Sequence, residues 1–394
     1  MPDQKTDNQT PPTDSNPLNT VQRTLFTDHW SFPLRVLGKA LILFLLLNLL
    51  FAWLSPLEGL GGVSFYNWLL PGRERLPYGE NSTLAYNLSL YNVPAMIASH
   101  EITQEKAEDE YRVLLIGDSA SWGWFLENED TLAGQLNGMD LRREDGKRVV
   151  VYNMAYPVMS LTKDLMLLDA AGQFDPDLIL WPVTLESFPR EKQLFAPIVQ
   201  NNPDRVRPLV EAYDLLLDTA DSRFVDPTYL DRTIVGSRRS LADLLRLQLY
   251  GFSWAATGID QYIPQEITLR SSDFEEDITW QTFDEPVEFT EQDLAWDVLD
   301  AGRLMAGDIP LLLVNEPMYI GNGENSDLRY NAFYPRWAYD QYRELLAEKT
   351  AREGWNFLDL WEAIDPQEFT DTPVHLTPEG SRQLAELIAP AILK

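Results

Sequence analysis

The sequence contains no cysteine and only three histidines, His29, His100 and His375. The absence of cysteine excludes disulfide bonds, thiolate catalysis and Cys-ligated metal sites, and it leaves the redox compartment of the protein open. Three histidines are too few for a histidine-rich metal site. We therefore expect no metal and no other cofactor, although the composition alone leaves an all-carboxylate cation site open.

Positive charge is also scarce, because 31 Lys and Arg face 61 Asp and Glu, which gives a formal net charge of −30. No Lys/Arg-rich block is present to neutralise phosphates, so we expect no nucleic-acid partner. The acidic residues are spread along the chain, as is typical of a solvated surface. The 394 residues are 45% hydrophobic and include 12 Trp and 17 Phe, enough for one large globular domain with accessory segments.

The N-terminal part changes abruptly in composition. Residues 1–32 are rich in Pro, Asn, Thr and Asp, and we predict a disordered cytoplasmic tail. Residues 33–57 are mainly apolar, carry no charge after Lys39, and are long enough to cross a bilayer. Because Arg35 and Lys39 precede the apolar run, the positive-inside rule predicts a retained single-pass signal anchor with the main domain outside the cytoplasm. A cleaved signal peptide or a core helix is the alternative, and the long leader disfavours cleavage.

Residues 58–107 show no sustained periodicity and are interpreted as a loop-rich collar, in which His100 is expected to be structural or on the surface. From residue 108 to 394, short apolar stretches alternate with helical patterns. The expected strands are Val113–Ile116, Arg148–Tyr152, Asp177–Val183, Ile309–Asn315 and Trp355–Trp361; the expected helices are Asp130–Met139, Ser160–Gly172, Gln292–Met305, Arg336–Arg352 and Thr377–Ile392. This alternation predicts a parallel five-stranded sheet in a three-layer α/β/α sandwich of flavodoxin type.

Residues 190–290 interrupt the alternation and contain several helical patterns, such as Arg239–Trp254. An insertion at the carboxyl end of the third strand would lie near an active site. Two interpretations therefore stay open, a helical lid over that site and a subdomain at the edge of the sheet.

Two stretches carry residues suited to nucleophilic catalysis. Gly117-Asp118-Ser119 ends the first strand, where reactive groups collect in open α/β sheets, and the small hydroxyl of Ser119 is a candidate nucleophile. Near the C-terminus, Asp371 and His375 precede the last helix and would supply a base and the carboxylate that orients it. The sequence thus predicts a hydroxyl nucleophile and an imidazole at one rim of the sheet.

These stretches together resemble the SGNH, or GDSL, hydrolase superfamily, over roughly residues 108–394 and with a large insertion. The resemblance implies that Ser119 is the nucleophile, that His375 is the general base and then acid, and that Asp371 orients the imidazole. In the family the carboxylate stands three residues before the histidine, where this chain has Thr372. If Asp371 does not reach the ring, Ser119 and His375 would act as a dyad.

The resemblance also implies an oxyanion hole made by the serine N–H, a glycine N–H and an asparagine side chain. The glycine position corresponds to Val158, whose N–H can still donate if its backbone fits, and the asparagine position corresponds to Glu186. Losing one oxyanion donor raises the activation free energy by about 3 kcal/mol, and a negative charge beside the oxyanion raises it further. Three explanations stay open: Glu186 is protonated and donates, it turns away and Thr184 or Ser187 substitutes, or the protein is no hydrolase.

The positions of two polar residues suggest where a substrate would bind, whereas the substrate class follows from the resemblance alone. Asn315 ends the fourth strand and Arg329 lies in a polar, aromatic loop, and both are substrate-binding candidates, although such a loop is also ordinary turn chemistry. The implied function is an extracytoplasmic serine esterase or O-acyltransferase, held in the bilayer by residues 33–57 and acting on acyl esters of cell-envelope glycans. The alternative, favoured by Val158 and Glu186, is an inactive module that binds glycan or a partner protein. A cation-dependent phosphoesterase would need a cluster of metal-ligating residues, and the sequence shows no such residues at a recognisable spacing.

Overall fold

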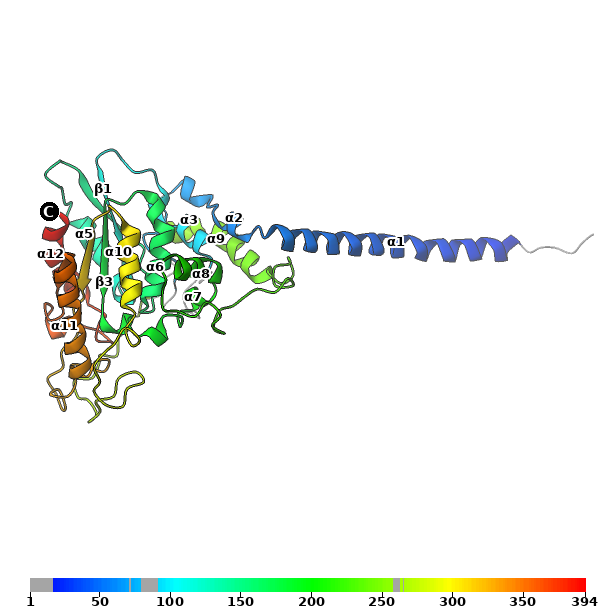
Figure 1. The fold of residues 1–394 in the computed structure, drawn as a ribbon. Helices are drawn as coiled ribbons and strands as arrows, with labels where there is room; N and C mark the ends of the chain where they lie inside the picture. The colour runs from blue at the N-terminus through cyan, green and yellow to red at the C-terminus, as the bar shows by residue number, and fades with distance from the viewer. Residues whose placement is uncertain (1–16, 71, 79–90, 258–262, 265) are drawn as a thin grey trace, which may run out of the picture. The chain divides into compact units, whose positions relative to one another are not determined.

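The computed structural model describes the chain except for residues 1–16, 71, 79–90, 258–262 and 265 (Figure 1). The chain divides into two compact units. One holds the chain up to Ser55 together with Thr228–Ser237, and the other holds Pro56–Pro227 and Arg238–Lys394.

The first unit is dominated by the long helix α1 (Pro17–Leu54), in which Phe32–Leu54 is long and apolar enough to cross a membrane. The helix ends where Pro56 follows, because proline lacks an N–H and disfavours helical backbone at the preceding residue. The predicted disorder of residues 1–32 is wrong from Pro17 onward. Pro17 stands in the first helical turn, where its missing N–H costs nothing, and the helix runs without a break into the apolar stretch. The rest of that tail lies outside the described residues.

The second unit is built on a parallel five-stranded sheet with the strand order β2-β1-β3-β4-β5. This is the flavodoxin order, and it confirms the predicted fold class. The strands lie close to their predicted positions: β1 (Glu110–Leu115), β2 (Arg148–Asn153), β3 (Leu178–Val183), β4 (Leu311–Asn315) and β5 (Asn356–Asp359). The edge strand β5 is half-exposed and shorter than its apolar stretch.

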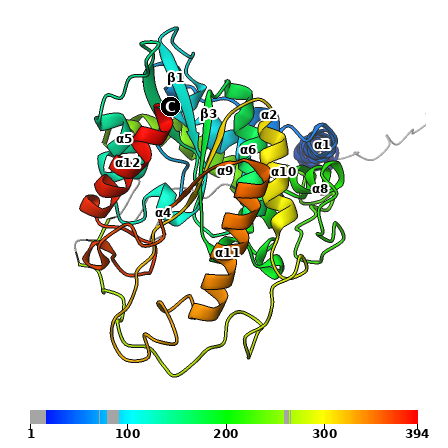
Figure 2. The same ribbon diagram turned by 60° about the vertical axis from the view of Figure 1, so that its left-hand side comes forward.

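Helices cover both faces of the sheet, because successive strand residues point to opposite sides. Val113 and Leu115 of β1 belong to one core with α5 and α12, whereas Leu114 belongs to the other core with α6, α10 and α11. Figure 2 shows α5 and α12 to the left of the sheet and α6 and α10 to its right. The bounds are α5 (Leu132–Gly138), α6 (Leu161–Ala171), α10 (Trp296–Ala306), α11 (Arg336–Glu353) and α12 (Pro378–Ile392).

The segment predicted to be a collar is in fact part of the second unit. It forms α2 (Leu57–Gly61), α3 (Val93–Ala98) and the 3-10 turns η1 (Tyr66–Trp68) and η2 (Glu101–Thr103). Leu76, Val93 and Ile102 are fully buried in the core beside α6. The irregular segment therefore packs against the sheet domain, because its scattered apolar side chains have a core to enter.

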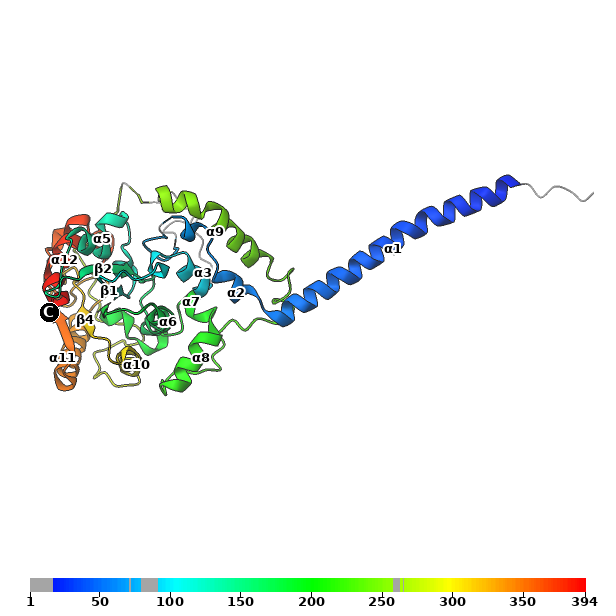
Figure 3. The same ribbon diagram turned by 90° about the horizontal axis from the view of Figure 1, so that it is seen from above.

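The interrupting segment contains α7 (Pro197–Gln200), α8 (Pro203–Ala212) and α9 (Arg238–Thr257). Helices α7 and α8 pack against α6, and α9 packs against η1 and α2. Figure 3 shows α9 beside α2 and α3.

Candidate active site

Ser119 stands on a tight turn between β1 and the short helix α4 (Ser119–Trp122). Gly117 has φ +148°, and a side chain there would meet Ser121 Oγ at 2.6 Å, so only glycine fits the turn. The Asp118 side chain accepts a hydrogen bond of 2.8 Å from the Ala120 N–H and caps α4. The turn therefore fixes Ser119 in the first position of the helix, just beyond the carboxyl end of β1.

His375 is held by the closed loop that contains Asp371. Thr370 and His375 face each other across this loop, because the Thr370 N–H donates to the His375 carbonyl oxygen at 2.8 Å. The His375 N–H in turn donates to Thr372 Oγ1 at 3.2 Å. The imidazole stacks on Trp124 with ring centroids 5.7 Å apart and an interplanar angle of 20°. Backbone closure and ring packing thus fix the imidazole orientation.

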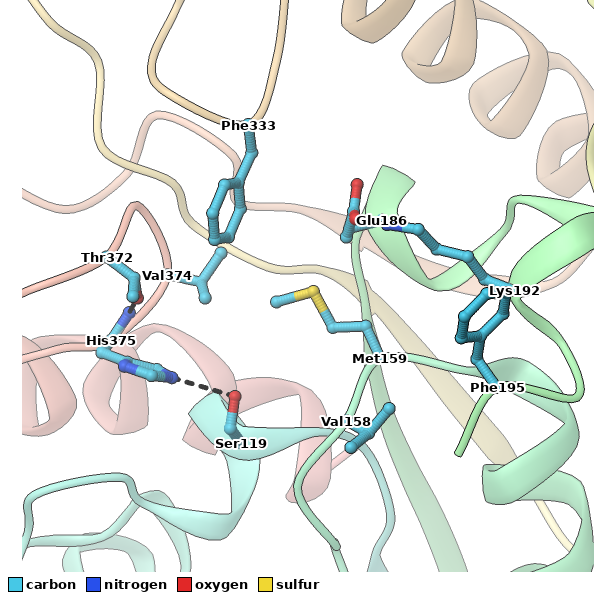
Figure 4. Close-up of a pocket in the computed structure, with 10 residues that line it drawn as sticks. All are labelled: Ser119, Val158, Met159, Glu186, Lys192, Phe195, Phe333, Thr372, Val374 and His375. Carbon is cyan, nitrogen blue, oxygen red and sulfur yellow. Dashed lines mark hydrogen bonds and ion pairs between the residues drawn. The ribbon is translucent and has the colours of Figure 1, made fainter. Parts of the chain in front are cut away.

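The structure brings Ser119, His375 and Asp371 into one hydrogen-bonded chain. His375 Nε2 lies 2.9 Å from Ser119 Oγ, and His375 Nδ1 lies 2.9 Å from Asp371 Oδ1 (Figure 4 shows the first contact). Burial opposes ionisation of Asp371, but its hydrogen bond and charge interaction with His375 outweigh this and lower the pKa of Asp371. The loop bends between Asp371 and His375, so the unusual spacing of four residues still lets the carboxylate reach the ring.

The backbone of Val158 has the conformation that a glycine would normally adopt. Its φ is +85°, which is strained for a β-branched residue, and its side chain lines the cavity beside Ser119. Within the described part of the chain, neither the Ser119 N–H nor the Val158 N–H donates to a protein acceptor. Ser119 and Val158 both line the cavity, so each brings to this part of the protein a backbone donor without a protein acceptor among the described residues.

Lys163 joins the turn that carries Ser119 to the loop that carries Val158. Its ammonium group is fully buried and donates to the carbonyl oxygens of Gly117 and, at 2.7 Å, Tyr156. The Tyr156 N–H also donates to the Gly117 carbonyl oxygen at 3.0 Å. Because both segments share these partners, buried hydrogen bonds fix their relative position.

Glu186 is engaged away from Ser119. Its carboxylate forms an ion pair with Lys192 and accepts hydrogen bonds of 3.0 and 2.9 Å from the Gln281 amide. Figure 4 shows the carboxylate pointing away from the Ser119 hydroxyl. Thr184 is buried, and its hydroxyl pairs with Tyr334 Oη at 2.9 Å, so it does not substitute as an oxyanion donor.

A cavity of about 370 Å³ opens beside Ser119 and His375. Its wall is mainly apolar, and the Glu186–Lys192 pair lies at a distance from the Ser–His end (Figure 4). The remaining wall consists of Val158, Met159, Phe195, Phe333, Thr372 and Val374. Lys192 and Phe195 belong to the interrupting segment, whereas α7, α8 and α9 contribute no lining residue. Helices α7, α8 and α9 therefore do not line the cavity, and the choice between a lid and a subdomain at the edge of the sheet stays a prediction.

The two substrate-binding candidates are placed elsewhere, which corrects that expectation. Asn315 is fully buried and donates to Asp359 Oδ1 at 2.8 Å. Arg329 is also buried, and its guanidinium donates to backbone carbonyls, including that of Thr279 at 3.2 Å. Both side chains satisfy protein partners and neither lines the cavity. Among the described residues, no group of three His, Asp or Glu is suited to hold a metal ion.

Sequence reasoning missed Lys163, Lys192 and Gln281. A lysine inside the amphipathic pattern of α6 is an unusual core residue, and this was the available indication for Lys163. Gln281 is 95 residues from Glu186, and no local pattern connects them.

No protein-family model matches the chain, and no curated protein matches it. Among solved structures it is similar to a carbohydrate acetylesterase family member from Sinorhizobium meliloti, with 14% identity, 72% of this chain and 98% of that chain covered, and a TM-score of 0.31. It is also similar to an aryl esterase from M. smegmatis (11% identity, 71% and 97% covered, TM-score 0.32) and to a G-D-S-L family protein from Desulfitobacterium hafniense DCB-2 (11%, 71% and 98%, TM-score 0.31). Identities and TM-scores this low carry no argument about activity, so the function is argued from the site itself.

Proposed function

We propose that the protein is a serine esterase or acyltransferase that acts on carboxylic esters. The observation that carries the proposal is the hydrogen-bonded chain from Ser119 through His375 to Asp371 at the wall of a cavity. A hydroxyl, an imidazole and a carboxylate in this order are the parts that acyl transfer requires.

The first step would form an acyl-enzyme. Ser119 Oγ attacks the carbonyl carbon of the ester while its proton passes to His375 Nε2, and Asp371 accepts the hydrogen bond from Nδ1–H. The oxyanion is held by the N–H groups of Ser119 and Val158. As the carbon–oxygen bond to the alcohol breaks, His375 returns the proton to the departing oxygen.

The second step would release the acyl group. His375 takes a proton from water or from an acceptor hydroxyl, whose oxygen attacks the acyl carbon, and it then gives that proton back to Ser119 Oγ as the enzyme ester breaks. Water gives hydrolysis, and a sugar hydroxyl gives acyl transfer. The orientation of the Glu186 carboxylate away from Ser119 supports this route, because the carboxylate pairs with Lys192 instead of facing the oxyanion.

A finer part of the proposal concerns location and substrate. The helical segment Phe32–Leu54 would anchor the protein in a membrane, and the basic residues Arg35 and Lys39 near its start support an N-terminus in the cytoplasm and a catalytic unit outside it. An acyl ester of an envelope glycan is the proposed substrate at that location. The apolar wall would take the acyl group, with the polar Glu186–Lys192 end left for the hydroxyl-bearing part.

Fluorophosphonate labelling of the full-length protein tests the chemistry. We expect one label on Ser119, no label in Ser119→Ala, and normal labelling in Ser121→Ala, whose hydroxyl is buried two residues further on. A folded wild-type protein that takes no label would contradict the proposal and favour the module that binds glycan or protein without chemistry.

A further inference from the structure

Helix α9 is apolar on two sides, one of them buried against the protein and the other largely exposed. Leu244, Leu247 and Trp254 are buried in a core with Tyr66 and Ala95. On another side, Leu245, Leu249 and Phe252 follow each other at spacings of four and three residues and are 60%, 65% and 38% exposed. This spacing forms a second apolar stripe, in which Phe252 packs edge to face on Tyr66 with ring centroids 6.1 Å apart, whereas Leu245 and Leu249 are more exposed.

The turn η1 extends this apolar stripe. Phe65, Trp68 and Leu69 are 54%, 73% and 77% exposed. The Phe65 N–H donates to Gln248 Oε1 of α9 at 2.9 Å, and the Phe65 and Trp68 rings pack edge to face with centroids 5.2 Å apart. The views in Figures 1 and 3 both place α9 beside α2 and α3. We name this region the η1–α9 surface and define it by Phe65, Trp68, Leu69, Leu245, Leu249 and Phe252.

The charge of α9 differs from that of the chain as a whole. The helix carries three arginines, one aspartate and no glutamate, in a protein whose net charge is −30. Arg238, Arg239 and Arg246 are exposed. An exposed apolar stripe with aromatic residues and flanking arginines is the composition of a helix that lies in a membrane interface.

The chain itself limits how far this surface can be from a membrane. Phe65 follows Leu54, the end of the candidate span, by eleven residues, which reach at most about 40 Å when fully extended. Part of that length is used by α2, so the actual reach is shorter. A bilayer crossed by Phe32–Leu54 would therefore lie within reach of Phe65 and Trp68.

We propose that the η1–α9 surface docks into the headgroup region of the same bilayer that α1 crosses. Trp68 and Phe65 would lie at the level of the headgroups and upper acyl chains, and the arginines of α9 would face lipid phosphates. The catalytic cavity stays outside this contact, because no residue of the surface lines it. Docking would hold the catalytic unit in one orientation above the membrane.

Lipid-quenching fluorescence tests this contact, and the absence of native cysteine makes single labelling straightforward. Trp68→Cys and Leu249→Cys in the full-length protein are each labelled with bimane and reconstituted into phosphatidylcholine–phosphatidylglycerol vesicles with lipids spin-labelled near the headgroup. Leu304→Cys on α10, 70% exposed, is the matched control, and Leu43→Cys reports whether α1 is inserted.

We expect the labels at 68 and 249 to lose most of their emission to the shallow spin label, while the label at 304 keeps it. Quenching at 68 and 249 no stronger than at 304, with the label at 43 quenched by deep spin labels, would overturn the docking while leaving the anchor intact. Shielding of 68 and 249 from aqueous iodide without lipid quenching would also overturn it, and would indicate a second copy or another protein on this surface.

Discussion

Two histidines of the same unit differ in what surrounds them. His375 contacts a hydroxyl on one ring nitrogen and a carboxylate on the other, and it lines a cavity. His100 is fully buried, and its ring nitrogens pair with backbone groups: Nε2 lies 3.1 Å from the carbonyl oxygens of Glu74 and Asn153, and Nδ1 accepts from the Ile102 N–H at 3.0 Å.

The comparison shows that partners, more than residue type, decide what a histidine can do. Backbone groups neither give up nor accept a proton at ordinary pH, so those around His100 fix one neutral tautomer. Burial, against the opposing effect of the two carbonyls, lowers the pKa of His100 to about 4. A serine hydroxyl can pass its proton to His375, and a carboxylate can stabilise the resulting imidazolium. His100 is therefore a structural connector, and His375 is the candidate catalyst.

The largest expected difference between the two positions is in activity. His375→Ala removes the proton acceptor for Ser119, and we expect esterase activity to fall by roughly 10⁴-fold or more, with thermal stability close to that of the wild type. Hydrolysis of a p-nitrophenyl ester, together with the thermal unfolding midpoint, checks this. If His375→Ala kept a tenth or more of the wild-type activity, His375 would not be the catalytic base, and its contrast with His100 would fail.

Changing the carboxylate partner sharpens the comparison further. Asp371→Asn leaves the loop shape but offers the ring an amide, and we expect a loss of about 10³–10⁴-fold in turnover. Thr372→Ala is the matched control at the next position, and its loss should be far smaller because its contact is to the His375 N–H. If Asp371→Asn and Thr372→Ala lost turnover equally, the carboxylate would have no special role. Ser119 and His375 would then act as a dyad whose geometry the loop alone maintains.

The opposite pattern is expected at the buried histidine. His100→Ala leaves two carbonyls and one N–H without their ring partner and opens a cavity, so we expect a loss of about 2–4 kcal/mol in the free energy of unfolding. Activity per folded molecule should stay near that of the wild type. Chemical denaturation and active-site titration measure the two quantities, and an intact stability with lost turnover would place His100 in the mechanism.

Glu101, next to His100, gives the smallest and most specific effect. Burial, with the charges of Glu74 and Glu110, raises the pKa of Glu101 to about 7. A carboxyl whose folded-state pKa is raised destabilises the fold as pH rises from the unfolded value, about 4.5, through 7. At pH 8 we therefore expect Glu101→Gln to have a higher free energy of unfolding than the wild type. This advantage over the wild type should be about 1–2 kcal/mol larger at pH 8 than at pH 5, after allowance for partial solvent access. Thermal unfolding at the two pH values checks this, and the same shift at both would show that ionisation is not the cause.

The sheet could be predicted from the sequence because its strands are short apolar runs with clear ends. Val113 and Leu115 alternate with residues of the opposite face, and Gly117 ends the run. The candidate nucleophile and base were recognisable for a related reason, since Ser119 follows the β1 strand and His375 lies in the loop just before the last helix. Local patterns therefore located the elements and named Ser119, His375 and Asp371, but they left open whether Asp371 reaches the ring.

The remaining parts of the site depend on contacts between distant segments. That Asp371 reaches His375 depends on loop closure through Thr370, and no rule of spacing specifies it. The outward position of Glu186 depends on Lys192 and on Gln281, which is far along the chain. The helical state from Pro17 and the burial of Leu76, Val93 and Ile102 likewise depend on segments that continue or cover them.

The central claim is that Ser119 is an activated nucleophile whose base is His375. Rapid-quench mass spectrometry of the full-length protein mixed with p-nitrophenyl acetate tests it most directly. We predict that one acetyl group accumulates on Ser119 during the first turnover and that none accumulates in His375→Ala. A wild-type protein that hydrolyses the ester without acetyl on Ser119, or a His375→Ala variant that acetylates Ser119 at the wild-type rate, would contradict the claim.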